Sequence, residues 1–349
     1  MEIDDDGIDD DGIDDAKQSH LNHALTPHQS LRPDQSLPSH QSLPSHQSLR
    51  PDQSLRSVKT QIEQLLREAG VDDREARAET ELMIEHATSL RRAQQVLNEK
   101  TQLSEEQIHT LNSILEGRAQ RIPLQYLLGE TVFMGLKLKM QRGVFIPRSD
   151  TEILVEVAAN KLKSLHESKQ RNLKVLEIGV GSGAIIISLL KLLPFLDATA
   201  VDRLDDALAL TKENAEALGV SHKLKLLKTA EWWELESKDF DAVLSNPPYI
   251  PVSDAPSLPP EVVLYEPPEA LFGSDEDGLG FYRKLSDVYS SLISPEGGLI
   301  VVEVGDGQAE PVSKIFSQGG LQNIEVHKDL KRLPRVIACQ ASSAAARVH

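Results

Sequence analysis

The chain has 349 residues, of which 40% are hydrophobic, so it is long enough to hold two ordinary domains with at least one sizeable core. Its formal net charge of -17 provides no broad basic field for a phosphate backbone, which favours a protein or small-molecule substrate over nucleic acid. Because Cys339 is the only cysteine and no apolar run approaches the roughly 20 residues of a bilayer span, we expect no disulfide, no metal site and no membrane association.

The first 56 residues have a low-complexity sequence. Ile-Asp-Asp-Asp-Gly occurs twice in succession from Ile3, and Gln-Ser-Leu then recurs every six residues from Gln29 to Gln53. A sequence of this kind cannot bury a core, so residues 1–56 are predicted to form a disordered tail. The tail also lacks the Arg-rich, acid-poor composition of an organelle signal.

Hydrophobic residues then recur at helical spacing, as in Val58, Ile62 and Leu65. This periodicity predicts a small helical domain of three to five helices at residues 57–129. Short alternating segments follow and predict a β-hairpin linker at residues 130–147.

Residues 148–341 alternate between helix and strand patterns, and residues 342–349 remain as a C-terminal tail. Ser149 and Glu152 have the spacing of a capping box, which predicts the start of a helix. The elements predicted after it are strand 173–178, helix 184–193, strand 197–202, helix 205–218, strands 223–228 and 240–245, helix 278–293, strand 298–304, and two final strands at 324–327 and 335–340 that pair antiparallel. Their order predicts an α/β fold with an open, mostly parallel sheet.

A glycine-rich loop follows strand 173–178 and leads into an apolar helix. Its residues are Gly179, Val180, Gly181, Ser182 and Gly183. Glycines allow the backbone to turn sharply and to approach a ligand closely. The next strand ends at Asp202, whose carboxylate can accept hydrogen bonds from both ribose hydroxyls of an adenosine ligand. The loop is one residue shorter than the dinucleotide motif, which favours S-adenosylmethionine over NAD as the cofactor.

Two adjacent tryptophans follow the third strand of this region. Trp232 is predicted to stack on the adenine of the cofactor, with Trp233 as its rival. The alternative for Trp232 is a position in the core or at its rim.

Strand 240–245 ends in Asn246, Pro247, Pro248 and Tyr249. An amide nitrogen is a poor nucleophile because its lone pair is delocalised into the carbonyl group. The Asn246 side-chain oxygen and the Pro247 carbonyl can each accept one N–H of a substrate NH2 group, which aims the nitrogen lone pair at a sulfonium methyl group. The prolines add no competing N–H donor, and Tyr249 offers a flat wall. These four residues therefore predict methylation of a planar amide or amine nitrogen, although the prolines alone would also end a strand.

Three further segments are distinctive. They are Pro-Leu-Gln-Tyr-Leu-Leu-Gly-Glu at 123–130, Phe-Ile-Pro-Arg-Ser-Asp-Thr-Glu at 145–152 and Tyr-Glu-Pro-Pro-Glu-Ala-Leu-Phe-Gly at 265–273. Together with Asn-Pro-Pro-Tyr, they make residues 58–340 resemble the HemK/PrmC family of peptide chain release factor N5-glutamine methyltransferases.

The resemblance implies a class I S-adenosylmethionine-dependent methyltransferase, with a Rossmann-like, mostly parallel seven-stranded sheet and a helical N-terminal domain joined by a β-hairpin. It implies that the glycine loop, Asp202, Trp232 and Asn246 contact the cofactor. Residues 246–249 would hold the glutamine of a Gly-Gly-Gln loop in a release factor. Members occur in bacteria, mitochondria and plastids, and the low-complexity tail favours a eukaryotic gene. We therefore expect a mitochondrial location, with cytoplasm and plastid as alternatives.

Two other functions use the same residues. A methyltransferase acting on a nucleic-acid amine would need a basic groove, whereas the helical region has mixed charge. A catalytically silent binding partner is disfavoured because the glycine loop, Asp202 and Asn246 are intact. Arg148 is interpreted as fixing the substrate loop or linker, or as pairing with Glu152 or Asp150, and Glu303 as a solvated acid after a strand.

Overall fold

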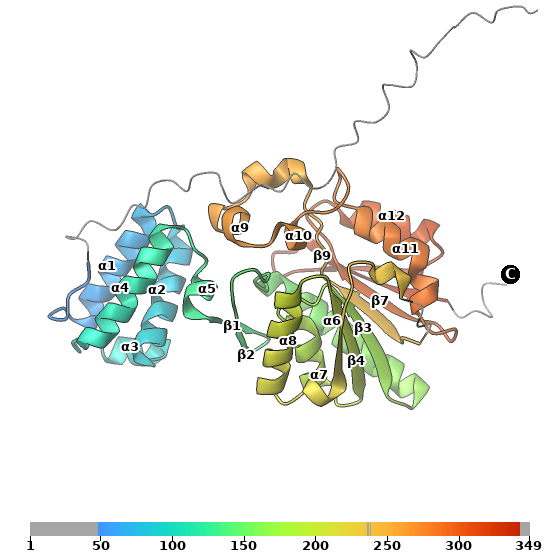
Figure 1. The fold of residues 1–349 in the computed structure, drawn as a ribbon, viewed down its shortest axis with the longest axis horizontal. Coiled ribbons are helices and arrows are strands. Elements are labelled where there is room, and N and C mark those ends of the chain that lie inside the picture. The colour runs from blue at the N-terminus through green and yellow to red at the C-terminus, as the bar shows by residue number, and fades with distance from the viewer. Residues whose placement is uncertain (1–47, 236, 238, 343–349) are drawn as a thin grey trace, which may run out of the picture. The chain divides into compact units, whose positions relative to one another are not determined.

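The computed structural model describes residues 48–235, 237 and 239–342 (Figure 1). Its N-terminal part contains five helices, which are α1 (Leu55–Glu68), α2 (Asp73–Thr88), α3 (Arg92–Leu97), α4 (Glu105–Ala119) and α5 (Leu124–Leu128). The buried positions of α1 are Leu55, Val58, Ile62, Leu65 and Leu66, and this spacing of three and four residues places them on one face. With residues of the other helices they form one hydrophobic cluster.

The helical domain begins earlier than the sequence predicts. Leu49 is 3% exposed and belongs to the same cluster as Leu55, and its backbone N–H donates to Asn112 Oδ1 at 2.9 Å. The predicted boundary after residue 56 is therefore wrong for residues 48–56. Leu49 and Leu55 end the last two Gln-Ser-Leu copies, so a segment that reads as repetitive supplies two core side chains. Residues 1–47 of the predicted tail lie outside the described residues.

A β-hairpin follows the helices, formed by β1 (Glu130–Phe133) and β2 (Leu136–Lys139). Its turn places Met134 and Gly135 at positive φ. Next come the 3-10 helix η1 (Ser149–Thr151) and α6 (Glu152–Lys169). The predicted capping box is wrong, because the N-cap residue of α6 is Thr151, which makes no side-chain cap, and Glu152 Oε1 instead accepts from the Met134 N–H at 2.6 Å. Glu152 thus ties the helix to the hairpin turn.

The C-terminal part is built on a seven-stranded sheet with the order β5-β4-β3-β6-β7-β9-β8. The strands are β3 (Leu173–Ile178), β4 (Leu196–Asp202), β5 (Leu224–Lys228), β6 (Ala242–Ser245), β7 (Gly298–Glu303), β8 (Gln322–Lys328) and β9 (Pro334–Ala341). All pairs among the first five strands are parallel, and β9 is antiparallel to both β7 and β8. The predicted fold class is confirmed, as is the antiparallel pairing of the last two strands.

Alternate strand residues bury two hydrophobic clusters on opposite faces of this sheet. Val175 and Leu244 belong to the cluster that includes α6 and α7 (Ala184–Leu192), with α8 (Asp205–Ala217) at its margin. Leu176 and Val243 belong to the cluster that includes α11 (Gly280–Leu292) and α12 (Ala309–Gln318). The strands are therefore covered on both sides, and polar chemistry is confined to their ends.

The remaining short elements lie in the connections. They are η2 (Ser221–Lys223), η3 (Trp232–Glu234), η4 (Val252–Ser257), α9 (Pro260–Tyr265) and α10 (Pro268–Leu271). In the segment after β6, Glu261 of α9 accepts from Arg121 Nη2 at 2.5 Å, and the Tyr265 hydroxyl donates to the Gln120 carbonyl at 2.7 Å. No helix of the described ranges combines the length and apolar character that a membrane span requires.

Candidate active site

Three predicted site residues and one further acid lie at the same edge of the sheet. The strands β4, β3, β6 and β7 are neighbours and run parallel, so their carboxyl ends lie side by side. Gly179 follows β3, Asp202 ends β4, Asn246 follows β6 and Glu303 ends β7. In open α/β sheets, ligands bind at this edge, where the strand order reverses.

The glycine loop has a backbone that only glycine adopts without strain. Gly179, Gly181 and Gly183 have φ values of +76°, +55° and +82°. A Cβ atom built on Gly179 or Gly181 would meet nothing within 4 Å, whereas one on Gly183 would come within 2.6 Å of an α7 side chain. The side chains of Val180 and Ser182 are buried, so the loop presents its main chain to the open side. The third glycine serves packing as well as backbone geometry.

Asp202 is fixed beside this loop by two backbone donors. Its Oδ2 accepts from the Gly181 N–H and its Oδ1 from the Leu204 N–H, each at 3.0 Å. A carboxylate has about four acceptor positions, so both oxygens keep capacity for further donors. The loop and the acid are thus one unit, with open space and free acceptors where the sequence predicts the ribose.

The two tryptophans face different surroundings. Trp232 is 9% exposed and packs in the same cluster as Ile178 and Val201, at the ends of β3 and β4, with its ring centroid 4.9 Å from that of Phe281. Trp233 is more exposed and lies beneath Lys284 Nζ, which is 5.2 Å from its ring centroid. Trp232 is therefore a core residue, and its contact with adenine stays a prediction.

Asn246 is oriented by a residue that precedes α6. Its Nδ2 donates to Thr151 Oγ1 at 3.1 Å, which leaves Oδ1 as the acceptor of the amide. The strand end before it is fixed because the Ser245 hydroxyl donates to the Ile178 carbonyl at 2.7 Å. Pro247 is buried and Pro248 is partly buried. The turn is therefore rigid, and sequence inspection did not identify Thr151 as part of it.

Tyr249 is held at both ends. Its hydroxyl donates to Glu303 Oε1 at 3.2 Å, and its carbonyl accepts from Gln308 Nε2 at 2.9 Å. Gln308 Oε1 in turn accepts from the Gly305 N–H at 2.9 Å. Burial and the charge of Glu303 raise the pKa of Tyr249, so the phenol keeps its proton as a donor. The predicted wall is a ring clamped by the loop after β7.

Glu303 is not the solvated acid that the sequence suggests. It is 1% exposed, and burial raises the pKa of its carboxyl to about 7 from an ordinary value of 4.5. The nearby Thr151 hydroxyl and the Tyr249 hydroxyl, which donates to Oε1, oppose this rise in pKa. One feature of the sequence could have placed Glu303 at this site. It ends a predicted strand of the parallel sheet, and the carboxyl ends of parallel strands share one edge.

Comparisons with known proteins agree on one family. Residues 58–129 match the model of the PrmC N-terminal domain, and residues 136–255 match that of the methyltransferase small domain. The chain is 38% identical over 272 residues to the release factor glutamine methyltransferase of Geobacter sulfurreducens, covering 78% of this chain and 91% of that relative. It is 36% identical over 278 residues to the protein of the same name from Caulobacter vibrioides, covering 80% and 93%.

The chain belongs to the release factor glutamine methyltransferase family. It is an enzyme, and its cofactor is S-adenosylmethionine. The chain is also 30% identical to a protein of solved structure, the protein-(glutamine-N5) methyltransferase of Alicyclobacillus acidocaldarius. This match covers 56% of this chain and 94% of that protein, with a TM-score of 0.36.

Arg148 of this methyltransferase pairs with neither of the acids next to it in sequence. It forms an ion pair with the buried Glu266, which follows α9, and its guanidinium lies 5.0 Å from the Phe145 ring centroid. Glu266 also accepts from the Ile146 N–H at 3.3 Å. The predicted pairing with Glu152 or Asp150 is wrong, and Arg148 instead links the start of the domain to the segment after Tyr249.

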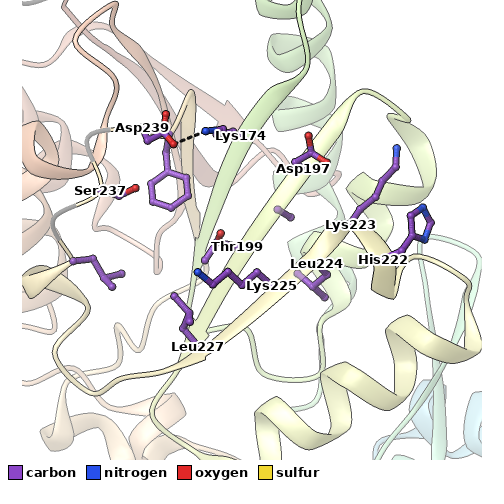
Figure 2. Close-up of a pocket in the computed structure, with 13 residues that line it drawn as sticks. Lys174, Asp197, Thr199, His222, Lys223, Leu224, Lys225, Leu227, Ser237 and Asp239 are labelled. Atoms are coloured by element: carbon purple, nitrogen blue, oxygen red, sulfur yellow. Dashed lines mark hydrogen bonds and ion pairs between the residues drawn. The ribbon is translucent and has the colours of Figure 1, made fainter.

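The methyltransferase also has an open depression of about 590 Å³ away from these residues (Figure 2). It begins at Lys174 and Asp197, near the amino ends of β3 and β4, and runs along the edge strand β5 past Lys225 and Leu227. None of the predicted site residues lines it. This depression therefore does not coincide with the candidate site at the strand ends.

Proposed function

We propose that this protein methylates the side-chain amide nitrogen, N5, of the glutamine in the Gly-Gly-Gln loop of a peptide chain release factor. The proposal is supported by relatives that carry the name release factor glutamine methyltransferase. The observation that carries it is the 3.1 Å hydrogen bond from Asn246 Nδ2 to Thr151 Oγ1, because this bond reserves Asn246 Oδ1 for a donor from outside. A primary amide has two such donors.

In this proposal, residues 179–183 and Asp202 hold the cofactor, with Trp232 at the adenine. S-adenosylmethionine supplies an electrophilic methyl group on a sulfonium centre. Asn246 Oδ1 and the Pro247 carbonyl accept the two N–H groups of the glutamine amide. Accepting both favours a pyramidal nitrogen and fixes the direction of its lone pair, which is catalysis by orientation and preorganised dipoles.

Pro248 and Tyr249 complete the substrate site. Neither proline of the turn has an N–H that would compete for the two acceptors. The Tyr249 ring, clamped through Glu303 and Gln308, forms a flat wall against the planar amide. The partner we propose is therefore a protein, with no direct contact to nucleic acid.

The test is methyl transfer to a release factor from label-bearing S-adenosylmethionine. A release factor with Gly-Gly-Gln is expected to take up label, and a variant with asparagine in place of that glutamine is expected to take up none. The asparagine side chain is one methylene shorter and withdraws the amide from the acceptors. Label on both proteins, or on neither, would contradict the proposed function.

We also propose that the protein acts in mitochondria. The repetitive sequence of residues 1–47 favours a eukaryotic gene, and family members are known in that organelle. A fluorescent fusion of the whole chain is expected to overlap with a mitochondrial marker, beside a fusion that starts at residue 48. Uniform cytoplasmic signal or plastid signal from the whole chain would contradict this location.

A further inference from the structure

Glu303 occupies a position where a carboxyl group is costly. It lies among the hydrophobic residues of the cluster under α11 and α12, and the Tyr282 hydroxyl donates to its main-chain carbonyl at 2.7 Å. A buried acid in such surroundings needs hydrogen bonds to offset its loss of water. Glu303 Oε1 has one, from Tyr249, and Oε2 has no partner of hydrogen-bond geometry within the described ranges.

Thr151 stands between this acid and the catalytic turn. It is 2% exposed, and its Oγ1 accepts from Asn246 Nδ2 at 3.1 Å. A hydroxyl has one proton to donate, and the Thr151 hydroxyl lies close enough to the Glu303 carboxyl to lower its pKa. Glu303 Oε2 is the acceptor still available to that proton.

The direction of these hydrogen bonds has a chemical consequence. An ionised carboxylate only accepts, so a Thr151 proton that is turned toward Glu303 leaves a lone pair of Oγ1 for Asn246. A lone pair there selects the NH2 side of the Asn246 amide and therefore directs Oδ1 to the substrate. If the amide were reversed, its NH2 group would face the glutamine N–H that Oδ1 is to accept, donor against donor.

We propose that Glu303 is a positioning residue that fixes, through Thr151, which end of the Asn246 amide faces the substrate and, through Tyr249, the plane of the ring beside it. This inference rests on the proposed function and adds two residues to its machinery. Glu303 touches neither substrate nor cofactor in this scheme, since it acts through the side chains of Thr151 and Tyr249.

Protonation of Glu303 would weaken this control, because a carboxylic acid donates as well as accepts. The titratable and charged groups that face it are Tyr249, Tyr282, Arg335 and Asp150. Arg335 favours the ionised carboxyl and Asp150 opposes it, and the pKa of about 7 places the change within the working range of an assay. Turnover is therefore expected to fall as the pH drops through about 7.

The decisive experiment compares Glu303→Gln, Thr151→Val and Thr151→Ser in methyl transfer to a release factor, with Glu310→Gln as a control on the exposed start of α12. At pH 8, Glu303→Gln and Thr151→Val are each expected to lower kcat by at least about tenfold, while KM and the Kd of S-adenosylmethionine stay within about twofold. Thr151→Ser keeps the hydroxyl that Thr151→Val removes, so its kcat is expected to stay within about threefold of wild type. The decline of turnover below pH 7 is expected to be absent in Glu303→Gln.

Wild-type kcat in Glu303→Gln, or equal kcat in Thr151→Val and Thr151→Ser, would overturn the inference. If Glu303→Gln does not fold, as judged by circular dichroism and cofactor binding, the two Thr151 variants still decide it. Absence of label with the wild-type enzyme would contradict the proposed function and this inference together. Wild-type transfer with an unaffected Glu303→Gln variant would contradict this inference alone.

Discussion

Asp202 Oδ2 lies 3.0 Å from the Gly181 nitrogen and joins the end of β4 to the loop after β3. Asp202→Ala removes both this acceptor and the ribose acceptor, so we expect the Kd of S-adenosylmethionine to rise by about ten- to a hundredfold. Calorimetric titration measures it. The matched control is Asp205→Ala, an exposed acid in the first turn of α8, for which binding is expected to stay within about twofold. Equal effects of the two substitutions would argue against a ribose site at Asp202.

Alanine substitutions at two glycines can separate the effect of backbone strain on stability from the effect of a methyl group on cofactor binding. Gly181 and Gly219 both have positive φ and open space at the Cβ position, but Gly219 lies after α8, away from the strand ends. Alanine at either position is expected to lower the free energy of unfolding by about 1 kcal/mol. Only Gly181→Ala is expected to weaken S-adenosylmethionine binding, because its methyl group enters the open side of the loop. Denaturation and calorimetry of both variants test this, and weakened binding in Gly219→Ala would contradict it.

Asn246→Ala removes the side-chain acceptor of the substrate amide. Turnover is expected to fall at least about a hundredfold, because the variant loses an interaction aimed at the reacting nitrogen. Cofactor binding is expected to weaken only modestly, since Asp202 and the glycine loop remain. Single-turnover methyl transfer at saturating cofactor makes the comparison. Wild-type turnover in this variant would refute the role given to Asn246.

The buried Glu303 predicts an unusual dependence of stability on pH. Its folded-state pKa of about 7 lies above the ordinary 4.5, so its contribution is most favourable below pH 4.5 and is lost as the pH rises through about 7. The loss is about 3 kcal/mol by linkage. Glu303→Gln cannot ionise, so its free energy of unfolding relative to wild type is expected to increase between pH 5 and pH 8. Urea denaturation at both pH values measures it, and a constant difference between the two proteins would exclude this cost.

The corrected start of the helical domain has its own test. Leu49→Ala opens a cavity in a packed cluster and is expected to cost about 2 to 4 kcal/mol of unfolding free energy. Leu97→Ala is the control, because Leu97 is 84% exposed, and it is expected to change stability by less than about 0.5 kcal/mol. Chemical denaturation of both variants measures their free energies of unfolding. Equal losses of unfolding free energy in the two variants would indicate that residues 48–56 belong to the tail and not to the helical domain.

The sheet was predictable because each buried strand is a short apolar run that ends in a turn residue, as at Ile178 before Gly179 and Ser245 before Asn246. The alternation of strands with helices then predicts a mostly parallel sheet without any knowledge of contacts. The glycine loop and the Asn-Pro-Pro-Tyr turn were predictable for a related reason. Their chemistry lies in consecutive residues, so no tertiary information is needed to see them.

The rest depended on contacts between distant segments. Thr151 and Asn246 are 95 positions apart in the chain, and Arg148 and Glu266 are 118 apart. Sequence spacing favours local partners, which is why one of the two interpretations of Arg148 pairs it with its neighbours and why Glu152 is predicted to complete a cap. The burial of Glu303 does not follow from its sequence, because it depends on the neighbouring turn of Asn246 to Tyr249 that covers the end of β7.

The last two Gln-Ser-Leu copies anchor the helical domain through Leu49 and Leu55, and this has a consequence for how the gene can change. Tandem repeats gain and lose whole units during replication. A unit of six residues added or lost before residue 47 leaves the spacing between these two leucines and α1 unchanged. Loss of the final unit, in contrast, would remove a core leucine. We therefore expect related genes to differ in the number of upstream copies while keeping the last two.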